Sequence, residues 1–344
     1  IFFSIRTVQK DTFEYKETDS GFELEKFSNT GYITELEIDY VSSVKYDTED
    51  PDPNTNFRVV KDMSQKVTSI GKYALNCDEK VKVISIGADV EYVDPKAFYS
   101  CWALQRIEVD EANPNYCDIE GVLYNKDKTT IICVPTDHDT YRAEKYGHAK
   151  YDENGYRIEP ATDDPNYEQY KKDVLTYVVP SSVTTIGQLA FNYANMADIY
   201  LPEGLTSIET LGLFEIPLLN GIYTYKGENV TDTHFTAREA LGEVYLSLPE
   251  GLKYIGSDAL SYNPSLEYIY IPESVTFIGH HAFWDDVYKE SGELKGLAEI
   301  NVAADEDTFK DNTDTGDSWR PQYDYMLFKK SVSVNYSAER KALN

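Results

Sequence analysis

The sequence predicts a mainly β solenoid built from stacked repeats, and three observations support this fold class. A nine-residue motif, V/L-x-x-I-G-x-x-A-F/L, recurs along the chain. Apolar residues at alternate positions, often followed by proline, recur together with it. Both features return about every 23 residues, and a fixed period of this size is typical of repeat architectures.

The nine-residue motif forms the turn of each predicted repeat. Clear copies occupy residues 67–75, 183–191, 252–260 and 275–283, and weaker copies begin at Val90 and Leu205. We expect the glycine after isoleucine to adopt a positive φ. The small alanine should lie where the chain turns inward, and the phenylalanine or leucine beside it should fill the core.

The second element is a strand that ends at a fixed register position. That position is held by Pro180, Pro202, Tyr225, Pro249 and Pro272, with steps of 22, 23, 24 and 23 residues, and upstream by Gly87 and Asp110. Proline has no backbone donor, so it suits the point where a strand leaves its ladder. One repeat cannot bury its apolar face alone, so repeats must stack. A period in the leucine-rich-repeat range of roughly 20–29 residues predicts a right-handed solenoid of about seven or eight turns, with short turns, helical pieces and loop insertions.

These residues resemble a known family. V-T-x-I-G-x-x-A-F followed by L-x-x-I-x-I-P is similar to the BspA-like leucine-rich repeats of bacterial surface and secreted proteins, over roughly residues 60–305. The segment from Asn113 to Asp127 resembles a hairpin of the same family. The resemblance implies a cell-surface or secreted interaction and adhesion module that binds a protein or glycan, and it brings no catalytic residues.

The sequence divides into three predicted regions. Residues 1–66 form an N-terminal cap with a first strand at 33–38 and an acidic loop at 47–57. Residues 67–304 hold the repeats, interrupted at 136–173 by an insertion without helical or strand period. Residues 230–242 are interpreted as a short helix. Residues 305–344 contain a second acidic loop and a C-terminal capping hairpin.

A stripe of tyrosines is the candidate binding surface. Strand alternation points Ile269 and Ile271 inward and their tyrosine neighbours outward. In this register Tyr200 neighbours Tyr223, and Tyr245 neighbours Tyr268. The candidate ligand-binding residues are therefore Tyr200, Tyr223, Tyr245, Tyr268 and Tyr270. Two interpretations stay open: an aromatic binding face, or tyrosines selected for strand propensity and cross-strand pairing.

The charge of the chain narrows the partners. Its 344 residues include 32 Lys and Arg against 60 Asp and Glu, a net charge of −28. Such a chain repels phosphate backbones, so we expect no nucleic-acid partner. It has no basic patch for anionic lipid and no apolar run of about 18 residues, so we expect no direct membrane insertion. We expect a monomer that binds a host or bacterial surface protein or glycan.

Metal and cofactor sites are not indicated. The four cysteines, Cys77, Cys101, Cys117 and Cys133, form no CxxC pair. Cys77 and Cys101 lie one repeat apart, as a buried thiol pair or a disulfide, and a bridge between Cys117 and Cys133 is also left open. The acidic segments at 47–52 and 312–317 lack the spacing of a calcium loop. His280 and His281 occupy a variable slot, which indicates solvent rather than a metal. We expect no cofactor.

Enzyme chemistry has no recognisable motif in this chain. G-x-S-x-G, H-E-x-x-H, Walker and G-x-G-x-x-G patterns are missing from the sequence. The chain starts at Ile1, which we interpret as a mature or shortened chain without its secretion signal, so an extracellular or surface location is expected. Two alternatives remain: a structural spacer, or a non-catalytic region of a larger secreted enzyme.

Overall fold

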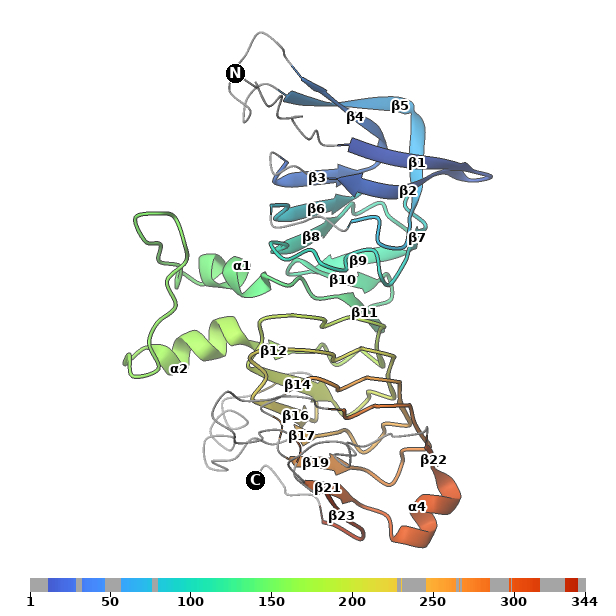
Figure 1. Cartoon of the computed structure of the whole chain (residues 1–344), viewed down its shortest axis with the longest axis vertical. Helices are drawn as coiled ribbons and strands as arrows, with labels where there is room; N and C mark the ends of the chain where they lie inside the picture. The colour runs from blue at the N-terminus through green and yellow to red at the C-terminus, as the bar shows by residue number, and fades with distance from the viewer. Residues whose placement is uncertain are drawn as a thin grey trace, which may run out of the picture. The chain divides into compact units, whose positions relative to one another are not determined.

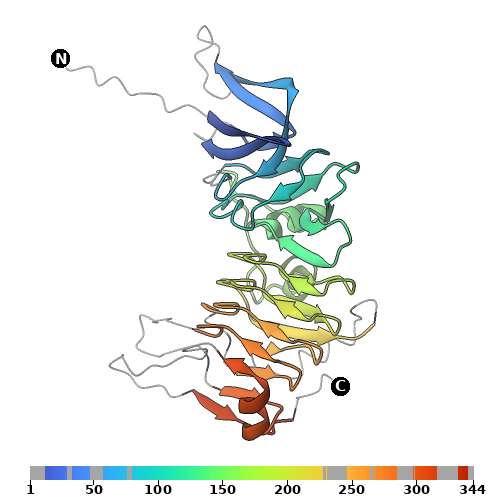
Figure 2. The same ribbon diagram turned by 90° about the vertical axis from the view of Figure 1, so that its right-hand side faces the viewer.

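The computed structural model places the repeats in two compact units (Figures 1 and 2). It describes residues 12–28, 33–46, 57–75, 80–227, 230, 246–263, 266, 268–284, 297, 299–315 and 332–339. Unit 1 comprises residues 1–126 and 135–137, and unit 2 comprises residues 127–134 and 138–344. The three regions expected from the sequence, with boundaries at 66/67 and 304/305, remain predictions.

Unit 1 combines an N-terminal sheet, a parallel ladder and a hairpin. The N-terminal sheet contains β1 (Thr12–Thr18), β2 (Gly21–Ser28), β4 (Tyr40–Tyr46), β5 (Phe57–Ile70) and β7 (Tyr92–Val93). The ladder contains β3 (Glu35–Ile38), β6 (Val83–Ile86) and β8 (Arg106–Val109). The hairpin consists of β9 (Tyr116–Ile119) and β10 (Val122–Asn125).

The sequence-predicted start of unit 1 is confirmed. β3 is the first strand expected within 33–38, and it pairs in parallel with β6. The hairpin expected after Asn113 is also present. The buried Asn113 side chain orders its entry: its amide donates to the carbonyls of Gly87 and Val90 at 2.8 and 2.9 Å. Its oxygen accepts from two backbone amides of the hairpin, so this asparagine ties one repeat to the next.

Unit 2 contains two parallel ladders. The first ladder runs through β12 (Thr176–Val178), β14 (Asp198–Pro202), β16 (Gly221–Tyr225), β17 (Leu246–Ser247), β19 (Tyr268–Ile271), β21 (Glu299–Val302) and β23 (Ser333–Asn335). The second runs through β11 (Thr130–Cys133), β13 (Thr185–Ile186), β15 (Ser207–Ile208), β18 (Tyr254–Ile255), β20 (Phe277–Ile278) and β22 (Asp314–Thr315). Each full repeat thus contributes one strand to each ladder.

Two columns of isoleucine form the core of unit 2. In the first ladder Ile199, Ile222, Ile269 and Ile300 lie in one register and are buried. In the second ladder Ile186, Ile208, Ile255 and Ile278 do the same. Burying each such side chain contributes about 1.5–3 kcal/mol. The 23-residue period therefore places the same apolar residue at the same depth in successive repeats.

The repeated glycine serves a different purpose from the one expected. The positive φ falls two residues later, at Tyr73, Leu189, Asp258 and His281, with values of 53–60°. The glycine is needed because the preceding repeat lies against it. A Cβ on Gly256 would lie 2.4 Å from the backbone nitrogen of Thr210, and one on Gly279 would lie 2.3 Å from that of Ser257. The prediction of a positive φ at glycine was wrong.

Two predicted loops contain helices. The insertion at 136–173 holds α1 (His138–Lys145), α2 (Tyr167–Tyr170) and a following π-helical turn, Lys171–Leu175. The acidic stretch at 305–318 contains α4 (Glu306–Asn312), because the Asp305 side chain accepts from the Thr308 amide at 2.9 Å. Acidic residues in the first turn favour the helix dipole, so this acidity stabilises a helix.

Several expected features fall outside the described residues. They are most of the acidic loop at 47–57, the helix expected at 230–242 apart from Val230, and residues 326–331 of the C-terminal hairpin. Beyond that segment, β23 extends the first ladder by pairing with β21. Over the ranges that the structure describes, no helix has the length and apolar character needed to span a bilayer.

Candidate functional site

The predicted pairing of the tyrosine stripe is confirmed. Tyr200 and Tyr223 lie opposite each other in β14 and β16. Their rings stack with centroids 5.1 Å apart and an interplanar angle of 29°. Tyr270 takes the same position in β19, opposite Ser247. We call this place, two residues before the register position, the strand-face position.

The predicted exposure of this stripe was wrong. Tyr200 is 0% exposed, Tyr223 is 3% and Tyr270 is 4%, while Tyr268 is half-buried. Tyr200 and Tyr223 form a second apolar cluster with Tyr225, and Val178, Val230 and Tyr268 pack against it. The strands here are buried on both faces, as in sheets covered on both sides. Tyr245 lies outside the described residues.

The chemistry of this cluster is that of an interior. The Tyr225 hydroxyl donates to the carbonyl of Val179 at 2.5 Å. Burial raises the pKa of Tyr225 to about 12. The buried carboxylate of Asp198 lies 3.4 Å from the ammonium of Lys171. As folded, the tyrosine cluster packs the protein and leaves its hydroxyl-bearing rings little surface for a ligand.

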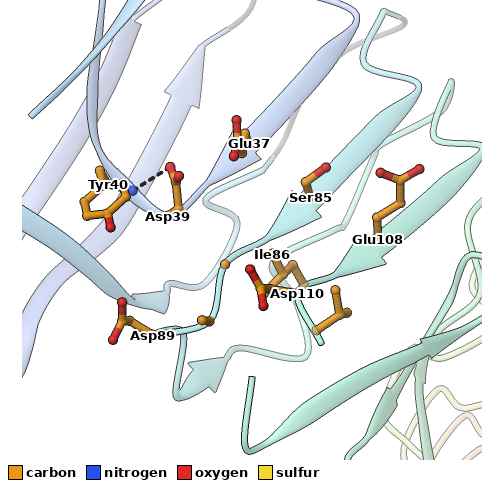
Figure 3. Close-up of a pocket in the computed structure, with 11 residues that line it drawn as sticks. Glu37, Asp39, Tyr40, Ser85, Ile86, Asp89, Glu108 and Asp110 are labelled. Carbon is orange, nitrogen blue, oxygen red and sulfur yellow. Dashed lines mark hydrogen bonds between the residues drawn. The ribbon is translucent and has the colours of Figure 1, made fainter. Parts of the chain in front are cut away.

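The same strand-face position is open in unit 1. Glu37 in β3, Ser85 in β6 and Glu108 in β8 lie side by side in register. Figure 3 shows the three side chains on neighbouring strands, on one face of the ladder. The strands follow a half-buried pattern, with Leu36, Ile84 and Ile107 buried beneath them. Alternation therefore gives unit 1 the polar outer face that unit 2 lacks.

A hollow of about 460 Å³ lies over this face. Its lining includes five carboxylates and no lysine or arginine: Glu37, Asp39, Asp89, Glu108 and Asp110. The aspartates sit where the strands end, as Figure 3 shows. Asp39 accepts from the backbone amide of Tyr40 at 2.7 Å, and Asp110 accepts from that of Ala112 at 2.8 Å. These bonds order the strand ends around the hollow.

Three bases at the rim partly offset this charge. Lys61 contacts Glu37 and Asp39 at 2.6 and 2.8 Å. Burial alone would lower the pKa of Lys61, but its hydrogen bonds to Asp39 and Glu37 outweigh that effect and raise the pKa. Lys66 pairs with Asp89, and Arg106 pairs with Glu108, each at 2.8 Å. Exposed pairs of this kind are worth about 0–1 kcal/mol, so a basic ligand can replace them.

The sequence contained the signal for this face. Gly87 and Asp110 mark the register of unit 1, so counting back two residues leads to Ser85 and Glu108. Sequence reasoning passed over them because it searched the strand-face position for aromatic residues. We call the surface formed by Glu37, Asp39, Ser85, Asp89, Glu108 and Asp110 the acidic strand face.

The remaining predicted sites have the following places. Cys101 is buried, Cys117 lies in β9 and Cys133 in β11, and Cys77 lies outside the described residues, so the disulfide alternatives stay predictions. The His281 ring lies 4.6 Å from that of Trp284 and its Nδ1 lies 3.9 Å from Asp258. No group of three or more His, Cys, Asp or Glu side chains is arranged for a metal ion within the described ranges.

Comparison with known proteins identifies the repeats. A model of the "BspA type Leucine rich repeat region" matches six copies, over residues 53–138 and 165–288. No curated protein matches the chain. The unmatched residues 139–164 coincide with the insertion.

Solved structures share the fold at low identity. The pneumococcal vaccine antigen PcpA is 19% identical, with a TM-score of 0.46, over 74% of this chain and 59% of that one. A leucine-rich repeat protein of Eubacterium ventriosum is 17% identical, with a TM-score of 0.45, over 80% and 64% of the two chains. A leucine rich cell surface protein of Faecalibacterium prausnitzii is 19% identical, with a TM-score of 0.45, over 80% and 52%.

The chain therefore spans 52–64% of the length of these three structures. The residues matched by the family model make up more than half of the chain. Their motifs coincide with the parallel ladders of both units. The chain is a mainly β protein and belongs to the BspA type leucine-rich repeat family.

Proposed function

We propose that the chain is a non-catalytic interaction module of a bacterial surface or secreted protein. Its acidic strand face binds a basic segment of a host or bacterial surface protein. The observation that carries this proposal is the open hollow in unit 1, lined by five carboxylates and no lysine or arginine. The corresponding position in unit 2 is filled by buried tyrosines, which disfavours the tyrosine stripe as the binding surface.

Electrostatics favours a basic partner. The net charge of −28 attracts cationic proteins over long range and raises their association rate at low salt. At close range, lysine or arginine side chains of the partner can take the places of Lys61, Lys66 and Arg106 in the rim pairs. Arginine is especially suited because its planar fork binds carboxylates in a bidentate manner.

The scaffold and location are part of the same proposal. We infer that the repeats wind as a right-handed solenoid; the parallel ladders within each unit support this winding, and the count of seven or eight turns remains a prediction. A secreted or surface location agrees with the family. If the chain were only a spacer, changes confined to the acidic strand face would leave partner binding unchanged.

Charge reversal tests the proposal. The full chain, Glu108→Lys and Glu91→Lys are compared for binding to an immobilised lysine- and arginine-rich peptide at low and high salt. Glu91 is an exposed residue of unit 1 outside the hollow, so its variant has the same net charge. We expect Glu108→Lys to weaken binding roughly tenfold, equal to about 1.4 kcal/mol, with a smaller effect at high salt.

The matched control decides between site and net charge. Equal weakening by both variants would show that only the total charge attracts the peptide, and it would contradict the assignment of the acidic strand face. Binding that is unchanged in both variants would contradict the proposed function itself. Circular dichroism of each variant checks that the exposed substitutions leave the fold intact.

A further inference from the structure

The insertion between the two blocks of family repeats presents an exposed aromatic surface. Residues 139–164 lie outside the family match. Within this segment Tyr146, Tyr151, Tyr156 and Ile158 are all exposed, and Tyr156 reaches 73%. Exposed aromatic rings are costly to leave without purpose and are enriched at binding sites. The insertion is thus a second place where a ligand can meet this chain.

The surface is held in one conformation by a short turn. Tyr151 and Arg157 form an antiparallel bridge. Between them the Asp152 carboxylate accepts the backbone amides of Asn154 and Tyr156, both at 2.8 Å. Gly155 supplies the left-handed backbone with a φ of +83°. The two tyrosines are therefore displayed by an ordered turn.

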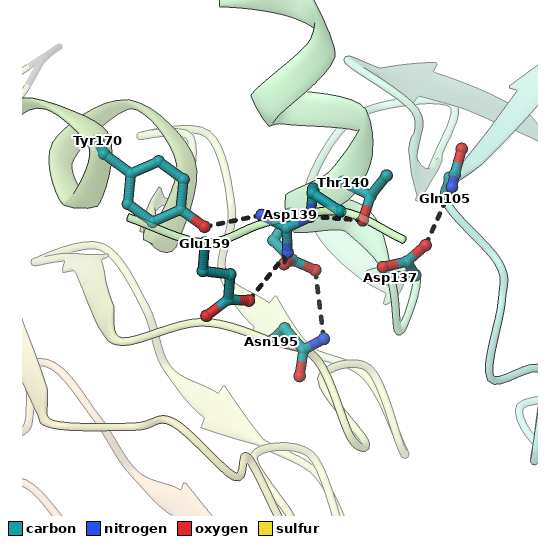
Figure 4. Close-up of polar contacts among 8 residues, drawn as sticks. Gln105, Asp137, Asp139, Thr140, Glu159, Tyr170 and Asn195 are labelled. Atoms are coloured by element: carbon teal, nitrogen blue, oxygen red, sulfur yellow. Dashed lines mark hydrogen bonds and ion pairs between the residues drawn. The ribbon is translucent and has the colours of Figure 1, made fainter. Parts of the chain in front are cut away.

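A buried ionic network anchors this turn to unit 2 (Figure 4). The Arg157 guanidinium pairs with the fully buried Asp139, and it donates to the Tyr170 hydroxyl at 2.7 Å and to Thr140 at 3.0 Å. Asn195, from the turn after β13, donates to Asp139 at 3.2 Å. The network fixes the insertion relative to the repeat beside it, which pre-organises any site the insertion carries.

A pocket of about 500 Å³ lies between the insertion and α2. One part of its lining is apolar and comes from Ile158, Pro160 and Ala161. The other part is polar and includes the amides of Asn166 and Gln169. Pockets that combine an apolar wall with a few polar groups are typical small-ligand sites.

The polar groups offer both donors and acceptors without net charge. The Gln169 amide nitrogen donates to Asp173 at 2.9 Å, so its oxygen is left as an acceptor. Lys150, which makes no ion pair within the described part of the chain, supplies donors. His148 and Lys150 face Glu159 and Asp164 in the same lining, so the charges largely offset one another. Hydroxyl groups both donate and accept, so they match this lining better than an ion does.

We propose that this pocket binds an uncharged, polyhydroxylated ligand, namely a neutral oligosaccharide. The C–H face of a sugar ring packs on Ile158 and Pro160, and the hydroxyl groups bond to Gln169, Asn166 and Lys150. The exposed Tyr156 and Tyr151 extend the contact to further sugar units. This site is separate from the acidic strand face in residues and in ligand chemistry.

The test uses the full chain and a panel of uncharged oligosaccharides of glucose, mannose, galactose and N-acetylglucosamine. Saturation-transfer NMR detects even millimolar binding, and calorimetry measures the affinity. Ile158→Asp places a charge on the apolar wall, while Leu218→Asp makes the same kind of change at an exposed position of unit 2 outside the pocket. Both residues are exposed, so neither change should alter the fold.

We expect at least one oligosaccharide to bind the parent chain and Leu218→Asp alike, and to bind Ile158→Asp roughly tenfold more weakly. Glu108→Lys in the acidic strand face should leave sugar binding unchanged, which separates this site from the proposed function. The proposal is overturned if no oligosaccharide of the panel binds the parent chain. Equal affinity of the parent and Ile158→Asp would overturn it as well.

Discussion

The stacking of one repeat directly on the backbone of the previous one can be tested at Gly256. This glycine follows β18, and its amide donates to the carbonyl of Ile208 at 2.8 Å. A Cβ here would lie 2.4 Å from the Thr210 nitrogen and 2.6 Å from the Glu209 carbonyl carbon. These are backbone atoms between strands of the second ladder, so they cannot move aside without separating β15 from β18.

The expected cost of Gly256→Ala follows from this contact. Overpacking of a well-packed interior costs about 1–3 kcal/mol, and a backbone contact at this distance belongs at the upper end. Gly204 provides the control, because its Cβ would approach nothing closer than 3.9 Å and its φ is not left-handed. Gly204→Ala should be neutral or stabilise by about 0.4–1 kcal/mol through the unfolded state. The two variants should therefore differ by about 2–4 kcal/mol.

Urea unfolding followed by circular dichroism measures this difference. The midpoint for Gly256→Ala should fall well below that of the parent, and the midpoint for Gly204→Ala should match or exceed it. If both variants unfold at the same urea concentration, the repeats do not lie against each other at the conserved-register glycine, and the ladder assignment in unit 2 is refuted.

Three further outcomes follow from the burial of specific groups. Tyr200→Ala should lower the free energy of unfolding by about 3–5 kcal/mol, as for other buried aromatic rings, and a melting temperature equal to the parent's would contradict its burial. The pKa of Tyr225, raised to about 12 by burial, means that stability present below pH 10 is lost as the pH rises towards 12, at up to about 1.4 kcal/mol per pH unit; urea midpoints at neutral and alkaline pH should converge less steeply in Tyr225→Phe. Arg157→Ala leaves Asp139 buried without its partner, at a cost of about 3–5 kcal/mol, so limited proteolysis should cut residues 146–165 faster than in the parent.

Strand pairing could be predicted from the sequence because it depends only on the period. A constant step of about 23 residues forces Tyr200 opposite Tyr223 and Ile269 beside Ile300, and the structure has both pairs. What covers the outer face of a strand does not follow from the period. The tyrosines of unit 2 are covered by residues such as Val230, which belongs to an irregular segment without a repeat signal.

The reasons for individual residues were harder to predict than their positions. Glycine at the turn was correctly singled out, but its neighbour in the previous repeat, and not its own φ, requires it. The insertion at 136–173 showed no helical period because its helices are short and held by ion pairs. Arg157 and Asp139 lie 18 residues apart, and sequence alone cannot join one arginine to one of 60 acidic residues.

Carboxyl footprinting tests the central claim most directly. The full chain is labelled with a carbodiimide and an amine, with and without the lysine- and arginine-rich peptide, and each labelled site is located by mass spectrometry. The account predicts that the peptide protects Glu37 and Glu108 of the acidic strand face while Glu91 keeps its labelling. Protection of Glu91 to the same degree, or unchanged labelling of Glu37 and Glu108 in the peptide complex, would contradict it.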